Sequence, residues 1–163
     1  MNDISIVLFW TKNQILCFSV SVPKKIAKEA QIHWIGMVDP ALYIIETNAR
    51  GRGVFTKGSI PANTIIEISP VIVMSGEERK LLDQTLLHDY IFEWGPDNAQ
   101  CCVALGYISI YNHSYGSNCE YEMDFKNAVI KIRTIRYIEA GEELFINYNG
   151  DWNNSKKLWF EVK

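Results

Sequence analysis

Cysteine pairs suited to metal binding are missing from this chain. Its 163 residues include four cysteines, Cys17, Cys101, Cys102 and Cys119, and no Cys-x-x-Cys pair. Because neighbouring side chains on a strand point to opposite faces, the adjacent cysteines are poor joint ligands, which disfavours a zinc-binding Cys/His protein. We therefore expect no metal site and reduced, partly buried thiols, as is usual inside cells.

A basic excess and a long apolar run are also absent. The net charge is -3, whereas a protein that binds the phosphate backbone of nucleic acid should carry a basic surface. The apolar run 4–10 is far shorter than the ~20 residues that span a membrane. Asp3, with no basic residue before it, argues against a secretory signal. We expect an intracellular protein, cytoplasmic or nuclear, with no direct nucleic-acid or membrane contact.

The composition that remains is that of one folded domain dominated by strands. Hydrophobic residues make up 48% of the chain and aromatic residues 12%, enough to bury a core. Short β-type runs bounded by turn residues recur along the chain, with Pro70 placed in one of the turns. The predicted strands cover 4–10, 15–20, 42–46, 64–68, 71–74, 89–94, 120–125, 129–133 and 144–146, and a further apolar strand pattern runs from 101 to 111.

Helix signals are few. Ser75 followed by Glu78 forms a capping-box pattern just before Leu81, Leu82 and Leu86. This pattern predicts a helix over 76–87, the one substantial helix of the core. A second, short helix is plausible over 24–34, outside the main strand region. The fold class is therefore mostly β.

Two glycines in the segment 51–55 (GRGVF) could serve a ligand. Gly51 and Gly53 follow a predicted strand in what reads as a turn, and without a Cβ they let a ligand approach the backbone closely. From this segment alone, a plain hairpin turn is the simpler interpretation. It is no phosphate loop, because Gly-Lys-Ser/Thr and a following amphipathic helix are missing.

Two later segments carry more chemistry. Residues 112–118 (NHSYGSN) combine amide, imidazole and hydroxyl groups around a glycine, and they predict a polar loop that offers side-chain amides and free backbone groups. Residues 142–148 (EELFINY) predict a strand that delivers Tyr148 at its end. There the ring can pack while the hydroxyl orients a polar reactant.

Together these segments resemble the SET domain, the fold of S-adenosylmethionine-dependent protein lysine methyltransferases. In that family Gly-x-Gly, Asn-His-Ser and Glu-Leu-x-x-Asn/Asp-Tyr segments recur in this order. The resemblance runs from about 41 to 152 and looks closest to minimal SET proteins of large DNA viruses and bacteria, which share stretches like 89–92 and 104–106. It implies a β-clip fold with several small antiparallel sheets, one short helix and a C-terminal pseudoknot that sets the last two segments side by side.

The resemblance also divides the chain. It implies a SET domain over 39–152, an N-terminal extension over 1–38 and a C-terminal tail over 153–163. The C-terminal zinc segment of larger SET enzymes is absent. Either the residues from 152 onward fold over the site, or a second subunit of a homodimer completes it.

The implied activity is protein-lysine N-methylation with S-adenosyl-L-methionine as cofactor and a lysine-bearing protein or peptide, histones included, as substrate. A lysine ammonium has an unperturbed pKa of about 10.4 and must lose its proton before it attacks the methyl group. Apolar, aromatic walls and a nearby sulfonium both disfavour the charged amine, and in-line placement supplies most of the rate. Such a site needs aromatic residues and backbone oxygens rather than a catalytic triad or a metal.

Residue by residue, the resemblance assigns Tyr148 as the catalytic residue that faces both the methyl group and the lysine nitrogen. The Asn112 side chain would hold the amino-acid end of the cofactor. The backbone of His113 would meet the adenine, with the imidazole in a structural role rather than as a general base. Gly51, Arg52 and Gly53 complete the expected cofactor-binding set.

Three further residues have competing interpretations. Tyr90 and His88, taken to share one strand face, would line the lysine channel with Tyr148. The competing interpretation is that Tyr90 is an ordinary core aromatic and His88 a surface histidine. Trp152 would cover the adenine or line the lysine channel. Ser117 stands where the family usually has proline, and this departure motivates an alternative function, a catalytically inactive SET-fold module that binds a peptide or protein.

Overall fold

The structure, a computed structural model, describes residues 4–11, 14–21, 36–48 and 50–158. The chain forms two compact units, Met1–Trp34 and Ile35–Lys163. In the first unit, β1 (Ile4–Thr11) and β2 (Gln14–Ser21) pair as an antiparallel hairpin, which confirms the strands predicted there. The helix predicted over 24–34 lies outside the described residues.

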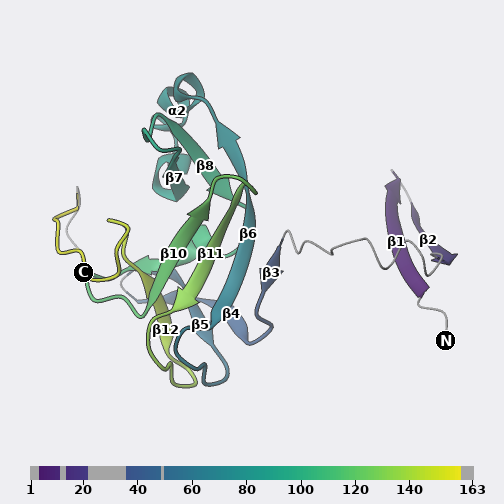
Figure 1. The fold of residues 1–163 in the computed structure, drawn as a ribbon, viewed down its shortest axis with the longest axis horizontal. Helices are drawn as coiled ribbons and strands as arrows, with labels where there is room; N and C mark the ends of the chain where they lie inside the picture. Colours follow the sequence, from purple (N-terminus) through teal and green to yellow (C-terminus); the bar gives the residue numbers. More distant parts are fainter. Residues whose placement is uncertain (1–3, 12–13, 22–35, 49, 159–163) are drawn as a thin grey trace. The chain divides into compact units, whose positions relative to one another are not determined.

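The second unit contains two sheets (Figure 1). The strands are β3 (Met37–Val38), β4 (Leu42–Thr47), β5 (Gly51–Thr56), β6 (Ile65–Met74), β7 (Ile91–Trp94), β8 (Gln100–Ala104), β9 (Asn112–His113), β10 (Cys119–Asp124), β11 (Val129–Thr134) and β12 (Glu143–Ile146). The larger sheet has the order β10-β11-β6-β8-β7 with β3 beside β6, and the smaller has β4-β5-β12-β9. With several antiparallel sheets and the α-helix α2 (Gly76–Leu82), the predicted mostly-β class is confirmed.

The core lies where apolar faces of both sheets meet. Ile66, Ile130 and Ile132 of the larger sheet and Leu144 and Ile146 of the smaller one are fully buried in one cluster. Burial of each such side chain contributes about 1.5–3 kcal/mol. Because β12 supplies part of this cluster, the residues just before and after it are held firmly in place.

Strand β6 corrects the prediction of two strands separated by a turn at Pro70. One ten-residue strand runs from Ile65 to Met74. At Pro70 it pairs with Val129 of β11, and from Val71 onward it pairs with β8. Proline is tolerated inside the strand because it lies where the pairing partner changes, and its carbonyl accepts a hydrogen bond from the Leu105 N–H at 2.9 Å.

The region after β6 departs most from the prediction. The capping box at Ser75 is present, but α2 ends at Leu82 instead of 87. The Thr85 hydroxyl then caps a 3-10 turn over Leu86–Tyr90, so the strand predicted from 89 begins only at Ile91. No residue of α2 is buried, so the expectation of a core helix is wrong.

The neighbourhoods of two signature segments also need correction. The strand pattern predicted to reach 111 ends at Ala104 and gives way to a 3-10 turn, Ile108–Ile110. Asn112–His113 is a short strand rather than part of a loop, and Gly51 and Gly53 lie in β5 rather than in a turn. In both places, pairing with β12 or β4 converts turn-forming residues into strand.

Candidate active site

Strand β12 brings the three signature segments into one sheet. It pairs antiparallel with β5, which carries the two glycines, and parallel with β9, where Phe145 lies opposite Asn112. The Ser114 N–H extends the pairing by donating to the Ile146 carbonyl at 3.1 Å. The two C-terminal segments therefore lie side by side, as the predicted pseudoknot requires; the threading itself stays a prediction.

A polar cluster forms around Gly53, and we call Arg50, Arg52, Gly53, Asn112 and Glu143 the Gly53 cluster. The Asn112 amide donates to the Arg52 carbonyl at 3.2 Å and to the Glu143 carboxylate at 2.8 Å. Arg50 approaches the other oxygen of that carboxylate at 3.7 Å. A Cβ on Gly53 would lie 2.5 Å from Glu143 Oε1 and 3.0 Å from Asn112 Nδ2, so any other residue here would require these two side chains to move.

Gly51 and Arg52, the other two predicted cofactor residues of β5, take part in the site through backbone atoms. Gly51 has φ +71°, a left-handed conformation that favours glycine, and a Cβ there would meet open space. Arg52 enters the cluster through its carbonyl. Both residues therefore shape the strand edge beside Asn112.

His113 is buried and bonded through one ring nitrogen. Its Nδ1 accepts a hydrogen bond from the Tyr148 N–H at 3.1 Å, which leaves the proton of the neutral ring on Nε2. Burial lowers the pKa of His113 and keeps the ring neutral at pH 7. Nε2 has no hydrogen-bond partner among the residues that the structure describes, and the ring packs edge-on against Tyr115 at a centroid distance of 4.6 Å. The imidazole thus anchors the chain next to Tyr148, as a structural role requires.

Tyr148 points its hydroxyl at the chain next to Asn112. The hydroxyl donates to the Tyr111 carbonyl at 2.9 Å. Burial, with added repulsion from Asp89 and Tyr90, raises the pKa of Tyr148 to about 12, so the phenol is neutral at pH 7. Tyr111 directly precedes Asn112 in the chain. The carbonyl that accepts the phenol hydrogen bond is therefore in the peptide group next to the Gly53 cluster.

Tyr148 lines a cavity of about 1260 Å³ whose walls include Tyr90, Tyr111 and Tyr121, and we call it the tyrosine cavity. Phe92 packs edge-on against Tyr121 at 5.5 Å, which adds to the aromatic wall. The predicted substrate residues Tyr90 and Tyr148 therefore share one cavity.

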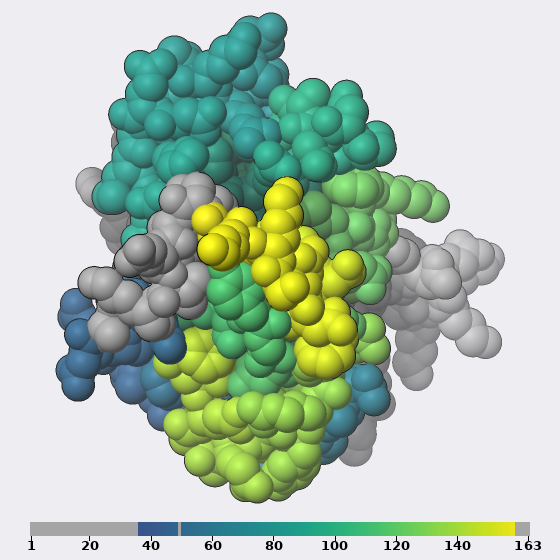
Figure 2. Space-filling view, turned by 90° about the vertical axis from the view of Figure 1, so that its left-hand side faces the viewer, coloured from purple at the N-terminus to yellow at the C-terminus, as the bar shows by residue number. Residues whose placement is uncertain are grey.

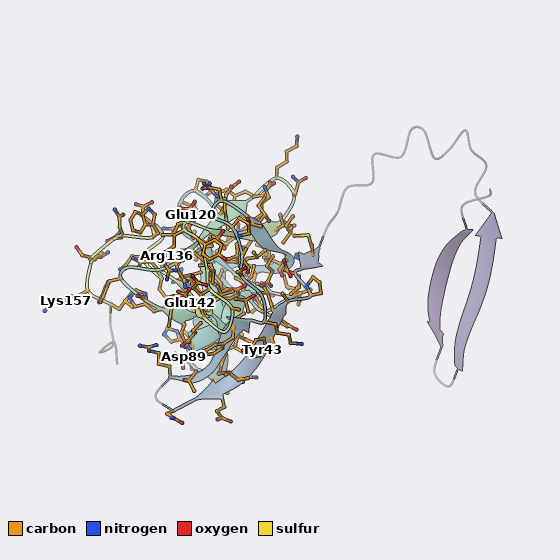
Figure 3. The ribbon with its side chains drawn as sticks, turned by 90° about the horizontal axis from the view of Figure 1, so that it is seen from below. Tyr43, Asp89, Glu120, Arg136, Glu142 and Lys157 are labelled. Carbon is orange, nitrogen blue, oxygen red and sulfur yellow. The ribbon has the colours of Figure 1, made fainter. Side chains whose placement is uncertain are left out.

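His88 also lines the tyrosine cavity, but it and Tyr90 both belong to the 3-10 turn Leu86–Tyr90, so the prediction that they share a strand face is wrong. Its Nδ1 lies 3.2 Å from the Asp83 carboxylate. Asp89, labelled in Figure 3, and Glu93 are further acidic lining residues. The lining thus carries carboxylates beside cationic side chains, and Arg79 pairs with Glu93 at 2.9 Å.

The C-terminal segment lies along this cavity. The Asn147 amide donates to the Asn154 carbonyl at 2.8 Å and the Asn149 amide to the Lys156 carbonyl at 2.6 Å, while the Leu158 N–H reaches the Tyr115 hydroxyl at 3.3 Å. Asn154, Lys156 and Leu158 line the cavity. In Figure 2 the yellow C-terminal residues lie on the same face as the teal residues around α2, with a recess between them, and the Lys157 side chain points outward (Figure 3).

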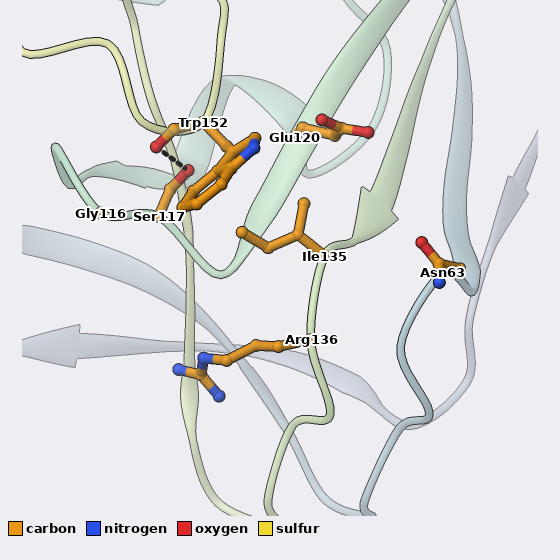
Figure 4. A pocket seen from close by; sticks show the side chains of 7 residues that line it. All are labelled: Asn63, Gly116, Ser117, Glu120, Ile135, Arg136 and Trp152. Carbon is orange, nitrogen blue, oxygen red and sulfur yellow. Dashed lines mark hydrogen bonds between the residues drawn. The ribbon is translucent and has the colours of Figure 1, made fainter.

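Trp152 is the predicted residue that lies elsewhere. It lines a smaller hollow of about 470 Å³ together with Ile135 and Arg136 (Figure 4). Its carbonyl accepts a hydrogen bond from the Ser117 N–H at 3.3 Å. The single proton of the Ser117 hydroxyl has the Cys119 carbonyl at 2.8 Å and the Trp152 carbonyl at 3.3 Å within reach, and the shorter bond to Cys119 is the stronger. The loop that lacks the expected proline is therefore held by a buried serine.

Comparison with known proteins agrees with this geometry. The model of the SET domain matches residues 51–149. The chain belongs to the SET domain family. A Schizosaccharomyces pombe protein named "Histone-lysine N-methyltransferase, H3 lysine-37 specific" is 39% identical over 128 residues, which cover 78% of this chain and 82% of that protein. The predicted family is thereby confirmed.

Solved structures agree on the fold. A Plasmodium falciparum protein, described as a candidate histone methyltransferase, is 30% identical with a TM-score of 0.56, over 71% of this chain and 98% of that one. A ctPRC2 structure, described as autoinhibited and bound to S-adenosylmethionine, is 21% identical with a TM-score of 0.58, over 68% of this chain and 15% of that one. At that identity the likeness shows the fold alone.

Three residues of this SET domain site were missed by sequence reasoning. Glu143 accepts the Asn112 amide. Asn118 accepts the Phe145 N–H at 2.7 Å and donates to the Glu143 carbonyl at 2.8 Å, so its amide stands in for a neighbouring strand. Tyr111 holds Tyr148. The first two lie within the quoted segments, which was the available signal; nothing in the pattern around Tyr111 pointed to its carbonyl.

The described part of the chain offers neither a metal site nor a membrane-spanning helix. No cluster of three or more His, Cys, Asp or Glu side chains there is placed to hold a metal ion. Cys101, Cys102 and Cys119 are buried free thiols, and burial raises the pKa of Cys102 and of Cys119 to about 12. None of the described helices has both the length and the apolar character needed to cross a bilayer.

Proposed function

We propose that this SET domain is an S-adenosylmethionine-dependent protein-lysine N-methyltransferase. The observation that carries the proposal is the hydrogen bond from the Tyr148 hydroxyl to the Tyr111 carbonyl at 2.9 Å. It links the phenol, which lines the tyrosine cavity, to the residue that directly precedes Asn112 of the Gly53 cluster. The name of the Schizosaccharomyces pombe relative supports a lysine of a histone as acceptor, and such a substrate would bring the enzyme to the nucleus.

The Gly53 cluster fits the amino-acid end of the cofactor. That end carries an ammonium and a carboxylate, so it needs acceptors and donors together. The Glu143 carboxylate, the Arg52 carbonyl and the oxygen of the Asn112 amide offer acceptors, and the Arg50 guanidinium offers donors. The bare Cα of Gly53 lets the Glu143 and Asn112 side chains lie close against the backbone there. When bound, the cofactor supplies a methyl group already activated by its sulfonium.

The tyrosine cavity prepares the amine. Its aromatic walls replace water around the lysine nitrogen and so favour the neutral, nucleophilic form over the ammonium. Tyr148 donates its proton to the Tyr111 carbonyl, so its oxygen can act toward the amine as an acceptor and orient it. The C-terminal segment, tied down by Asn147 and Asn149, helps to exclude water. Positioning and desolvation, rather than proton transfer to a strong base, would supply the rate.

The decisive test is transfer of a labelled methyl group from S-adenosylmethionine to an array of lysine peptides and to fractionated lysate of the native source. Reproducible labelling of lysine is the expected result. Cofactor binding without any labelled lysine would instead support the inactive interaction module. The buried, bonded Ser117 removes one reason for that alternative, since the loop is held without proline. Homodimerisation stays a prediction, testable by the mass of the protein in solution.

A further inference from the structure

A fully buried carboxylate, Glu67 of β6, lies behind the tyrosine cavity. Its hydrogen bonds come from neutral donors: the Ser69 hydroxyl at 2.7 Å, the Tyr107 N–H at 2.7 Å and the Tyr111 hydroxyl at 3.1 Å. A Cβ at Gly106 would overlap both the carboxylate and Ser69. Burying such a group is costly unless it is well bonded. The three donors and the glycine at 106 together allow the carboxylate to be buried here.

The bonds of Glu67 bracket the segment that forms one wall of the site. Tyr107 and Tyr111 flank the 3-10 turn Ile108–Ile110, and Ile108 and Tyr111 line the tyrosine cavity. Tyr111 is 1% exposed. Its hydroxyl donates to Glu67 while its carbonyl accepts the Tyr148 hydroxyl at 2.9 Å. One residue thus connects the buried carboxylate to the proposed catalytic phenol.

We propose that Glu67 is a positioning residue for methyl transfer: by holding the ring and backbone of Tyr111, it sets the direction of the Tyr148 hydroxyl. The inference rests on the proposed function for its catalytic meaning. Its geometric content does not, because the chain of hydrogen bonds is made entirely of this protein's own groups. A misplacement on the order of 1 Å at a reacting group can cost about a hundredfold in rate, so a small rotation of Tyr111 would be felt at the amine.

The test compares Glu67→Gln and Tyr111→Phe with a matched control, Thr134→Val. Thr134 is also fully buried and bonded, to the Pro61 carbonyl at 2.8 Å, but it has no bond to Tyr111 or Tyr148 among the described contacts. The readouts are kcat and KM on a lysine peptide, cofactor affinity by isothermal titration, and the 13Cζ resonance of Tyr148 in tyrosine-labelled protein. That resonance is identified by its loss in Tyr148→Phe.

We call Glu67→Gln and Tyr111→Phe the relay variants, because each changes the hydrogen bond between Glu67 and Tyr111. Both should shift the Tyr148 resonance and lower kcat roughly tenfold or more, with cofactor affinity within about twofold of wild type. Thr134→Val should lose stability but keep resonance and kcat. In a Tyr148→Phe background, Glu67→Gln should have little further effect, because the group it positions is gone. If Glu67→Gln does not fold, Tyr111→Phe alone carries the test.

Folded relay variants with an unmoved Tyr148 resonance and wild-type kcat would overturn the inference. If wild type labels no lysine, the proposed function fails, and the resonance then decides the positioning role by itself. A shift in both relay variants but not in Thr134→Val supports it, and no shift overturns it.

Discussion

The two halves of the candidate site are built differently. The Gly53 cluster sits on paired strands, where β5, β9 and β12 hold polar groups in a fixed register. The tyrosine cavity is formed largely by 3-10 turns and by the C-terminal segment, held by side-chain amides. The difference suits the two ligands: a cofactor of constant structure meets a rigid edge, and protein substrates meet segments that can vary.

The largest effect should come from the strand-built half. Asn112→Ala removes the amide that bonds Arg52 and Glu143 and leaves the carboxylate short of a partner. Since a hydrogen bond involving a charged group is worth about 1.5–3 kcal/mol, affinity for S-adenosylmethionine should fall roughly 10- to 100-fold in isothermal titration. Asn127→Ala, which alters an exposed turn amide, is the control. If both variants bound S-adenosylmethionine with equal affinity, the Gly53 cluster would not be the cofactor site.

Gly53→Ala should have the next largest effect. The new Cβ would displace Glu143 and Asn112, so cofactor affinity should fall about tenfold while the protein stays folded. Gly58→Ala adds a Cβ where nothing lies within 4 Å and should leave affinity unchanged. Loss of affinity in the Gly58 variant alone would contradict the assignment.

The turn-built half should respond in KM. Asn149→Ala frees the C-terminal segment at Lys156, so KM for a lysine peptide should rise a few-fold through looser walls, with cofactor affinity little changed. Steady-state kinetics over a range of peptide concentrations measures the split. A change in cofactor affinity without a change in KM would mean that this segment belongs to the other half.

The smallest effect concerns stability. Arg136 hydrogen-bonds Glu142 and lowers the pKa of that carboxyl from 4.5 to about 2. A depressed folded-state pKa adds stability that is present above pH 4.5 and is lost as pH falls toward 2. The contribution should be on the order of 1 kcal/mol for this partly exposed pair. Urea midpoints for wild type should fall between pH 5 and pH 3 more than those of Glu142→Gln; parallel curves would refute the pairing.

Sequence reasoning succeeded where local rules decide. Alternating runs located β10, β11 and β12, and the capping box located the start of α2. The residues proposed for the cofactor half, such as Asn112 and Gly53, have chemistry that is visible in the chain, and their role stays a prediction. In the substrate half, tertiary contacts decide. The Thr85 cap ends the helical pattern early, and Glu67 captures the N–H of Tyr107 from forty positions away.

Trp152 illustrates the same limit. An indole four positions after Tyr148 could reach either half by spacing alone, yet a carbonyl bond from Ser117 holds it in a separate hollow. Pro70 is a second case, since only the change of strand partner explains a proline inside β6. Both depend on contacts between segments that no local pattern encodes.

The central claim is that the two halves meet at Tyr111 and Asn112, with the Tyr148 hydroxyl at the junction. Methyl transfer to a lysine peptide by Tyr148→Phe, measured by mass spectrometry beside cofactor affinity, tests it most directly. The account predicts that transfer falls by roughly a hundredfold or more while S-adenosylmethionine binds as in wild type. Wild-type transfer rates in that variant, or loss of cofactor binding equal to that of Asn112→Ala, would contradict it.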